Sequence, residues 1–158
     1  MRRYPNGEVV ANLARMSNPS SHTVVVENDL SSTFAALSNV AEYPQWLSSI
    51  KSAKVLESDD QGRPTKVDLT IDAGMLKDRV TLDYDWSAAP EKLSFSLDEA
   101  DLLTTMDGSY TLKKLGDETQ VTYELFTEVS MPVPRMMIAK VEETTIKQSL
   151  EELVGKFE

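Results

Sequence analysis

The sequence predicts an α+β fold, in which a curved antiparallel sheet of about seven strands wraps around a long C-terminal helix in the order β-α-α-β6-α. Apolar and polar residues alternate between residues 50 and 129, with turn residues between the runs, as in sequential antiparallel strands. Residues 135–157 contain no helix breaker before Gly155 and place their apolar side chains in one sector. The length of 158 residues is typical of one domain with a single core.

The first part of the chain differs in pattern from the rest, and we expect residues 1–22 to be an N-terminal tail or extension. Two alternatives remain open for it. It is either a loosely docked short helix or an upstream extension that precedes a natural start at Met16. The β-branched stretch TVVVEN at 23–28 predicts the first strand, so the domain is expected to span residues 23–158.

Two short helices are expected between the first and second strands. Asp29 is a candidate N-cap, and Pro44 is expected to end or kink the helix that follows it. Tyr43, Pro44 and Trp46 place two large aromatics and a proline in a connector. We interpret this stretch as a structural corner that packs the short helices against the open end of the sheet, rather than as an active-site loop.

A straight helix cannot contact a curved sheet everywhere, so the pattern predicts a gap between the two, lined by apolar side chains. The strand acids, such as Asp68 and Asp83, alternate with the apolar positions and are therefore expected in solvent. Of the two neighbouring helix acids, Glu143 is preferred over Glu142 as the one that lines the gap; the alternative is that both lie in water. The residues expected to line this cavity are Met75, Tyr84, Trp86, Phe95, Tyr110, Tyr123, Met136, Ala139 and Glu143.

Composition argues against several classes of function. The chain has no cysteine and a single histidine, His22, so neither a metal site nor a Ser-His-Asp triad is expected. The net charge of −10 disfavours nucleic acid and anionic membranes as partners. No apolar run is long enough to span a bilayer. We therefore expect a cytoplasmic monomer or weak dimer without catalytic residues, metal or cofactor.

Several motifs resemble those of a known superfamily. Phe34 stands nine residues before the turn YPQW at 43–46, and the motifs DGSYTL at 107–112 and DETQVTYEL at 117–125 precede a proline-led C-terminal helix. Over residues 23–157 this order resembles the START-like, or helix-grip, superfamily, and in particular its polyketide cyclase/dehydrase-type branch with coenzyme Q-binding relatives. Many relatives carry an aspartate before the YPQW turn; this chain has Asn39, which can cap the turn but carries no charge.

The resemblance implies a hydrophobic ligand, because the superfamily binds lipids, quinones, hormones and polyketides, and only some of its members are enzymes. We therefore expect the chain to bind an apolar small molecule of the lipid, quinone or aromatic polyketide type in the cavity under the helix. A polyketide aromatase/cyclase is the first alternative, in which Tyr110, Tyr123 or Glu143 would orient the substrate or move protons. A regulatory protein-interaction module is the second alternative.

Overall fold

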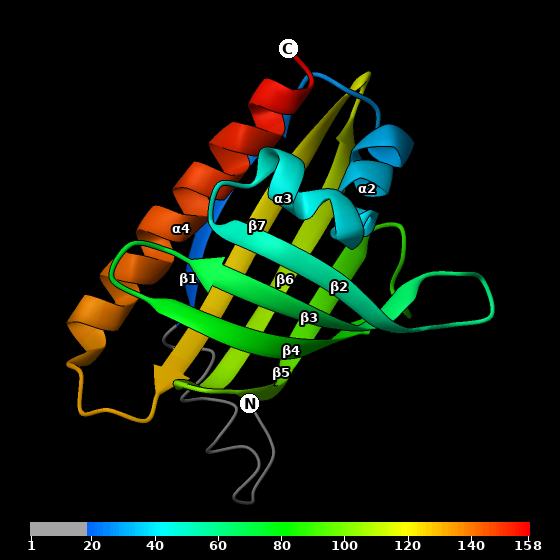
Figure 1. Cartoon of the computed structure of the whole chain (residues 1–158). Helices are drawn as coiled ribbons and strands as arrows, with labels where there is room; N and C mark the ends of the chain where they lie inside the picture. The colour runs from blue at the N-terminus through cyan, green and yellow to red at the C-terminus, as the bar shows by residue number, and fades with distance from the viewer. Residues whose placement is uncertain (1–18) are drawn as a thin grey trace, which may run out of the picture.

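The computed structural model describes residues 19–158 and confirms the α+β fold (Figure 1). One seven-stranded antiparallel sheet has the order β1-β7-β6-β5-β4-β3-β2. Its strands are β1 (Ser20–Val26), β2 (Ile50–Ser58), β3 (Pro64–Asp72), β4 (Lys77–Asp85), β5 (Lys92–Ala100), β6 (Leu103–Leu115) and β7 (Glu118–Val129). The helical elements are α2 (Leu30–Ser38), the 3-10 helix η1 (Val40–Glu42), α3 (Tyr43–Trp46) and α4 (Arg135–Lys156).

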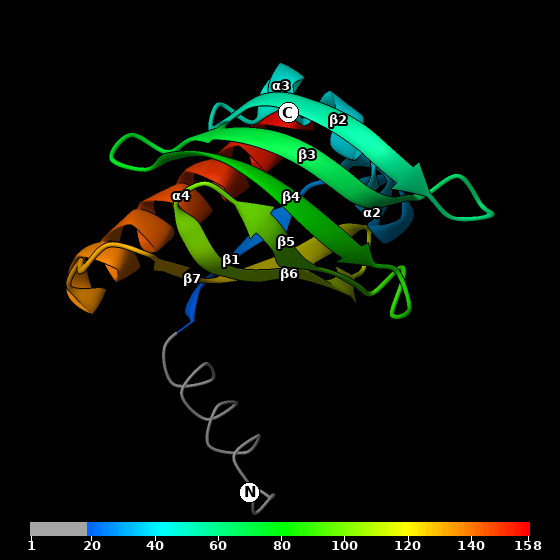
Figure 2. The same cartoon turned by 60° about the horizontal axis from the view of Figure 1, so that its bottom comes forward.

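The sheet curves around one side of α4. Strands β2 to β4 form one arm of the curve and β1 and β7 the other, with α4 between the two arms (Figure 2). The register between β4 and β5 shifts at Thr81 and Leu82, and further shifts occur between β2 and β3. Such irregularities bend a strand and increase its twist, which explains why the sheet can wrap around the helix.

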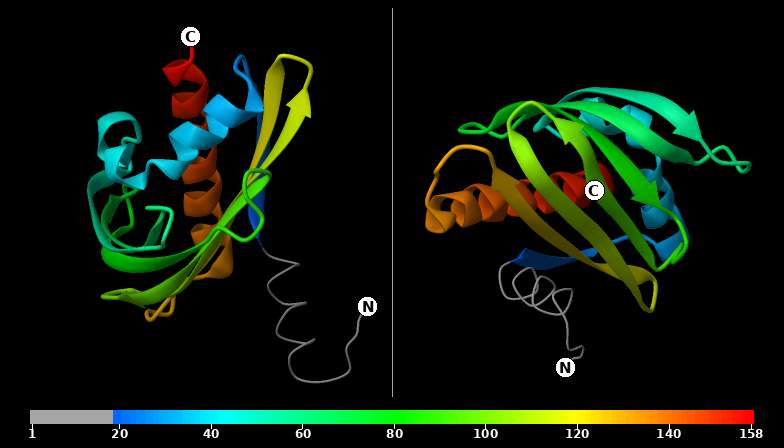
Figure 3. Two further views of the ribbon diagram at one scale, coloured as in Figure 1. Left: turned by 90° about the vertical axis from the view of Figure 1, so that its right-hand side faces the viewer. Right: turned by 90° about the horizontal axis from the view of Figure 1, so that it is seen from below.

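Helix α4 packs mainly along β1 and β7, and its C-terminal part reaches α3 (Figure 3). Its apolar stripe lies at one-turn spacing, and the side chains of Ile146, Leu150 and Leu153 are completely or almost completely buried. The strands of the far arm, β2 to β4, therefore make few contacts with α4.

The first strand begins at Ser20, three residues before the expected domain boundary at residue 23. Ser20, Ser21 and His22 pair with Leu125, Glu124 and Tyr123 of β7. The polar residues Ser20, Ser21 and His22 do not look like part of a strand in the sequence. They can be polar because β1 is an edge strand and exposes most of its side chains. The expectations for residues 1–18, including the start at Met16, lie outside the described residues.

The corner at residues 43–46 joins three helices. The Tyr43 hydroxyl donates to the carbonyl of Leu37 in α2, and the Tyr43 ring meets Trp46 edge to face at 5.7 Å. The ammonium of Lys156 in α4 lies 5.5 Å from the centre of the Trp46 ring. The expectation for Pro44 was wrong: α2 ends earlier, at Ser38, and Pro44 lies in the first turn of α3, where its missing N–H costs nothing.

Candidate functional site

A cavity lies between the concave face of the sheet and α4. Its volume is about 40 Å³, enough for one or two water molecules. It is lined by Tyr43, Leu47, Ser49, Ile50, Leu69, Ile71, Leu82, Tyr84, Phe95, Met106, Tyr110, Tyr123, Leu125, Thr145 and Ser149. None of these residues is charged, and their polar side-chain groups are all hydroxyls.

Two aromatic pairs form part of the cavity wall on the sheet side. Tyr110 of β6 and Tyr123 of β7 are direct cross-strand partners, and their rings stack with centres 4.3 Å apart. Tyr84 of β4 and Phe95 of β5 are also cross-strand partners, with ring centres 5.6 Å apart. Period-two alternation places all four on one face, so the sequence pattern is sufficient to bring them together.

The position of the Phe95 ring depends on Gly108, its partner on β6. A Cβ atom at position 108 would lie 2.2 Å from Cζ of Phe95, a distance that real Cβ atoms do not tolerate. The glycine therefore provides the space in which the Phe95 ring lies across β6.

The cavity tyrosines are held in their protonated form. Burial raises the pKa of Tyr84 and Tyr110 well above the ordinary value of a tyrosine. Burial also raises the pKa of Tyr123 to about 12, although its hydrogen bond with Tyr110 acts in the opposite direction. At neutral pH these hydroxyls are therefore hydrogen-bond donors or acceptors and not bases.

Four of the nine predicted lining residues do line the cavity: Tyr84, Phe95, Tyr110 and Tyr123. Trp86 does not. It follows the end of β4, its Nε1 donates to the carbonyl of Pro64 at 2.8 Å, and its ring meets Phe34 of α2 edge to face at 6.2 Å. Trp86 thus fills the core between α2 and the sheet, outside the cavity.

The other four predicted residues also lie outside the cavity. Met136 is 83% exposed and Met75, in the β3–β4 turn, is 76% exposed. Ala139 is half-buried, and its carbonyl lies 3.5 Å from the hydroxyl of Ser20. Glu143 is exposed to solvent. The physical reason is shared by the three helix residues: they lie in the first half of α4, which is hydrogen-bonded to β1 and β7 at the edge of the sheet.

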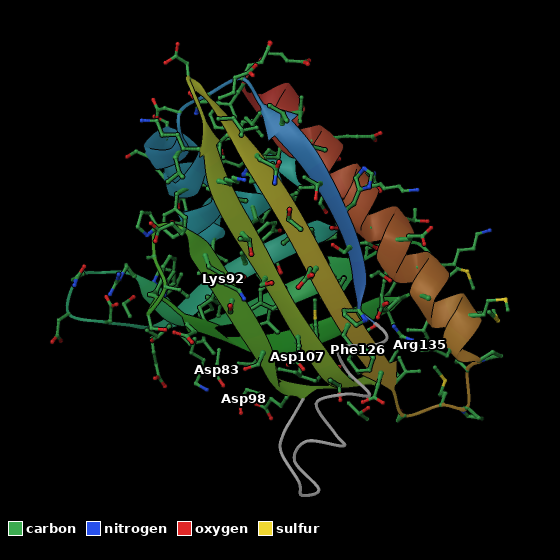
Figure 4. All side chains as sticks on the ribbon, turned by 180° about the vertical axis from the view of Figure 1, so that it is seen from behind. Asp83, Lys92, Asp98, Asp107, Phe126 and Arg135 are labelled. Atoms are coloured by element: carbon green, nitrogen blue, oxygen red, sulfur yellow. The ribbon has the colours of Figure 1, made fainter. Side chains whose placement is uncertain are left out.

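Glu142, and not Glu143, is the buried acid of α4, with 1% of its surface exposed. Its carboxylate accepts hydrogen bonds from N and Oγ1 of Thr127 at 2.5 and 2.7 Å, and from the Ser20 hydroxyl at 2.8 Å. Arg135 donates to it at 2.7 Å and also lies over the ring of Phe126 at 4.6 Å, at the end of β7 (Figure 4). This network joins α4 to β1 and β7, and Glu142 does not line the cavity.

Sequence reasoning missed the contribution of the corner and of the helix hydroxyls. Tyr43 is buried and lines the cavity in addition to supporting α2. Thr145 and Ser149 lie one helical turn apart on α4 and both line the cavity. The sequence contains a signal for these two residues, because both lie beside the apolar stripe of Ile146 and Leu150. A small polar side chain at such a position must meet a hydrogen-bond partner or a cavity.

The outer face of the sheet is charged and solvated, as its alternation predicted. Lys66 donates to Asp83 at 2.8 Å and to Asp98 at 2.9 Å, and both of these acids are labelled in the view from behind (Figure 4). Within residues 19–158 no group of three potential ligands could hold a metal ion. In the same range no helix is long and apolar enough to cross a membrane.

The sequence has a match among known protein families. It matches the family described as polyketide cyclase/dehydrase and lipid transport over residues 26–154, which is most of the chain. The chain belongs to this polyketide cyclase/dehydrase and lipid transport family. No curated protein sequence matches this family member significantly.

Solved structures share the fold of this polyketide cyclase/dehydrase family member. A START superfamily protein from Mycobacterium smegmatis is 25% identical, with 88% of this chain and 96% of that chain covered and a TM-score of 0.83. A protein from Thermus thermophilus is 14% identical, with coverages of 88% and 96% and a TM-score of 0.77. The Zhui aromatase/cyclase from Streptomyces sp. R1128 is 19% identical, with coverages of 87% and 92% and a TM-score of 0.73.

Proposed function

We propose that the protein binds a neutral hydrophobic small molecule that carries at least one hydrogen-bonding oxygen, in the cavity between the sheet and α4. The observation that carries this proposal is the composition of the cavity wall: the described residues that line it include seven hydroxyl side chains among apolar ones, and none of them is charged. The family to which the chain belongs, which includes lipid transport in its description, is consistent with such a ligand.

The wall argues for a neutral ligand because a buried charge without a partner is costly. A carboxylate, phosphate or ammonium group in this cavity would meet only hydroxyls and hydrocarbon. A carbonyl, ether or hydroxyl group instead finds donors such as Tyr84 and Tyr123, which remain protonated at neutral pH. The stacked pair of Tyr110 and Tyr123 offers aromatic surface to a planar ligand.

The cavity is smaller than a ligand. A benzene-sized guest needs about 150 Å³ in a protein interior, whereas the cavity has about 40 Å³. Binding must therefore widen the space between α4 and the sheet. Such widening moves the lining tyrosines, so ligand binding is expected to change the near-ultraviolet signal of these side chains.

The test uses β-naphthol and β-naphthoate, two ligands of similar size of which only the second is charged. Titration calorimetry is expected to show one-to-one binding of β-naphthol and at least tenfold weaker binding of β-naphthoate. The Tyr84→Phe variant should lose about fivefold in affinity for β-naphthol, as for one neutral hydrogen bond. The same variant should leave the affinity for naphthalene unchanged. Equal binding of the two naphthyl ligands would contradict a site selective for neutral molecules.

A polyketide aromatase/cyclase is the second candidate, favoured by the hydrogen-bonded pair of Tyr110 and Tyr123, which could hold a substrate carbonyl. The absence of Asp, Glu, His, Lys and Arg from the described lining residues makes proton transfer at neutral pH less suited to this site than binding. A linear poly-β-ketone thioester analogue tests the point. Its cyclisation faster than the uncatalysed reaction, lost in Tyr123→Phe, would favour the cyclase.

A further inference from the structure

A second hollow, here called the methionine groove, opens between the β3–β4 turn and the first half of α4. It has a volume of about 150 Å³ and is lined by Met75 and Leu76 of the turn, Val129 and Met131 around the end of β7, and Met137 and Val141 of α4, among others. In Figure 1 the turn between β3 and β4 lies beside α4. Three of these methionines are among the exposed large apolar side chains of the described chain.

The methionine groove lies next to the cavity between the sheet and α4, here called the tyrosine cavity. Met106 lines the cavity, and its cross-strand partner Thr127 lines the groove. On α4, Thr145 of the cavity lies one helical turn after Val141 of the groove. On β7, Leu125 of the cavity precedes Thr127 by two residues and so shares its face. Neighbouring residues of β6, β7 and α4 therefore line the two hollows, which lie side by side.

The two hollows differ in chemistry. The cavity offers several hydroxyls, whereas the groove is apolar apart from Thr127, whose hydroxyl and N–H are both bonded to Glu142. Among residues 19–158, none of those that line the groove is charged. At about 150 Å³ it has the volume that accommodates a benzene-sized apolar group, while the cavity has room for a small oxygen-bearing end.

We infer that the methionine groove binds the apolar chain of an elongated neutral amphiphile, whose oxygen-bearing end lies against the tyrosines of the cavity. This inference rests on the proposed function and adds to it the shape and the orientation of the ligand: polar end inward, chain outward. Methionine suits such a role because its flexible, polarisable side chain adapts to chains of different length and branching.

The test is a series of para-alkylphenols of increasing chain length, titrated against the full chain. Each added methylene is expected to raise the affinity about three- to fourfold until the groove is full. Met137→Ser should reduce this gain per methylene and leave the affinity for phenol itself unchanged. The matched control is Met136→Ser, the neighbouring methionine, which is more exposed and does not line the groove. It should leave the whole series unchanged.

Methionine methyl groups labelled with carbon-13 report where each part of the ligand lies. Phenol should shift the signal of Met106 in the cavity, and the longer homologues should also shift Met75 and Met137, with Met136 unaffected. If β-naphthol binds but affinity does not depend on chain length, the groove assignment fails and the proposed function stands. If the long homologues bind but shift only the signals of Met75 and Met137, the polar end does not lie in the tyrosine cavity, and that assignment fails instead.

Two other occupants of the methionine groove are outcomes of the same experiments. Ligand-free protein that binds phosphatidylcholine vesicles, with binding lost in Met137→Ser, would make a membrane the occupant. A dimer in sedimentation velocity that Met137→Ser dissociates would make a second copy of the chain the occupant. Either result would overturn the inference of a ligand chain.

Discussion

The carboxylate of Glu142 in α4 accepts two hydrogen bonds from Thr127 in β7, from its backbone N at 2.5 Å and from its Oγ1 at 2.7 Å. This contact joins the first half of α4 to the end of β7. Ser20 and Arg135 bond to the same carboxylate, so one side chain connects the first strand, the last strand and the C-terminal helix.

Removal of this carboxylate is expected to destabilise the fold. Glu142→Ala should lower the free energy of unfolding by about 3 kcal/mol, because it leaves buried donors without their acceptor. Glu143→Ala is the matched control: that side chain is exposed, and its loss should change stability by less than about 0.5 kcal/mol. Urea denaturation followed by circular dichroism measures both. Equal effects of the two substitutions would show that the network contributes no stability.

Any side chain at position 108 should lower the free energy of unfolding. Gly108→Ala places a methyl group 2.2 Å from Cζ of Phe95, and relief of this clash by shifts of ring or backbone should cost about 1–3 kcal/mol. In the Phe95→Leu background the same substitution should cost less, because the ring that it meets is gone. A double-mutant cycle on the free energy of unfolding measures this coupling. Purely additive effects would contradict the close approach.

The buried tyrosines should make stability fall at high pH. Burial raises the pKa of Tyr123 to about 12, above the value of about 10 for an unfolded tyrosine. The folded state therefore keeps its proton where the unfolded state loses it. This contribution is complete below about pH 10 and is lost as the pH rises through 12, with a slope of about 1.4 kcal/mol per pH unit for each such group.

Urea unfolding at several pH values measures this slope. Tyr123→Phe should lower it by about one proton between pH 10 and 12, and should have the same stability profile below pH 9 apart from a constant offset. The part of the tyrosinate difference absorbance that is missing in Tyr123→Phe should appear together with unfolding. If that part of the signal appeared reversibly in folded protein below pH 11, it would contradict the strong burial of Tyr123.

Trp46 tests the corner at residues 43–46. The loss of a fully buried aromatic typically costs about 3–5 kcal/mol, but Trp46 is only half-buried. We expect Trp46→Ala to destabilise the fold by about 2 kcal/mol, through the lost contacts with Tyr43 and Lys156. Affinity for β-naphthol should be retained, since Trp46 does not line the cavity. A variant of normal stability that no longer binds ligand would assign Trp46 to the site instead.

The sequence by itself determined the class of fold and much of the inner face of the sheet. Period-two alternation identifies which side of each strand faces inward, and it therefore brought Tyr84, Phe95, Tyr110 and Tyr123 together without knowledge of the tertiary structure. The long run without a helix breaker, with its apolar residues in one sector, also predicted the long helix, which spans Arg135–Lys156. These features depend on neighbours along the chain and on the two simple periods of strand and helix.

The tertiary structure decided what alternation and helical spacing leave open. Glu142 and Glu143 flank the same stripe of α4, and only the packing of α4 on β1 and β7 buries the first and exposes the second. The same packing removed Met136 and Ala139 from the cavity and created the methionine groove. The direction in which a helix lies on a sheet depends on contacts between residues more than a hundred positions apart, such as Ser20 and Glu142, and no local period encodes it.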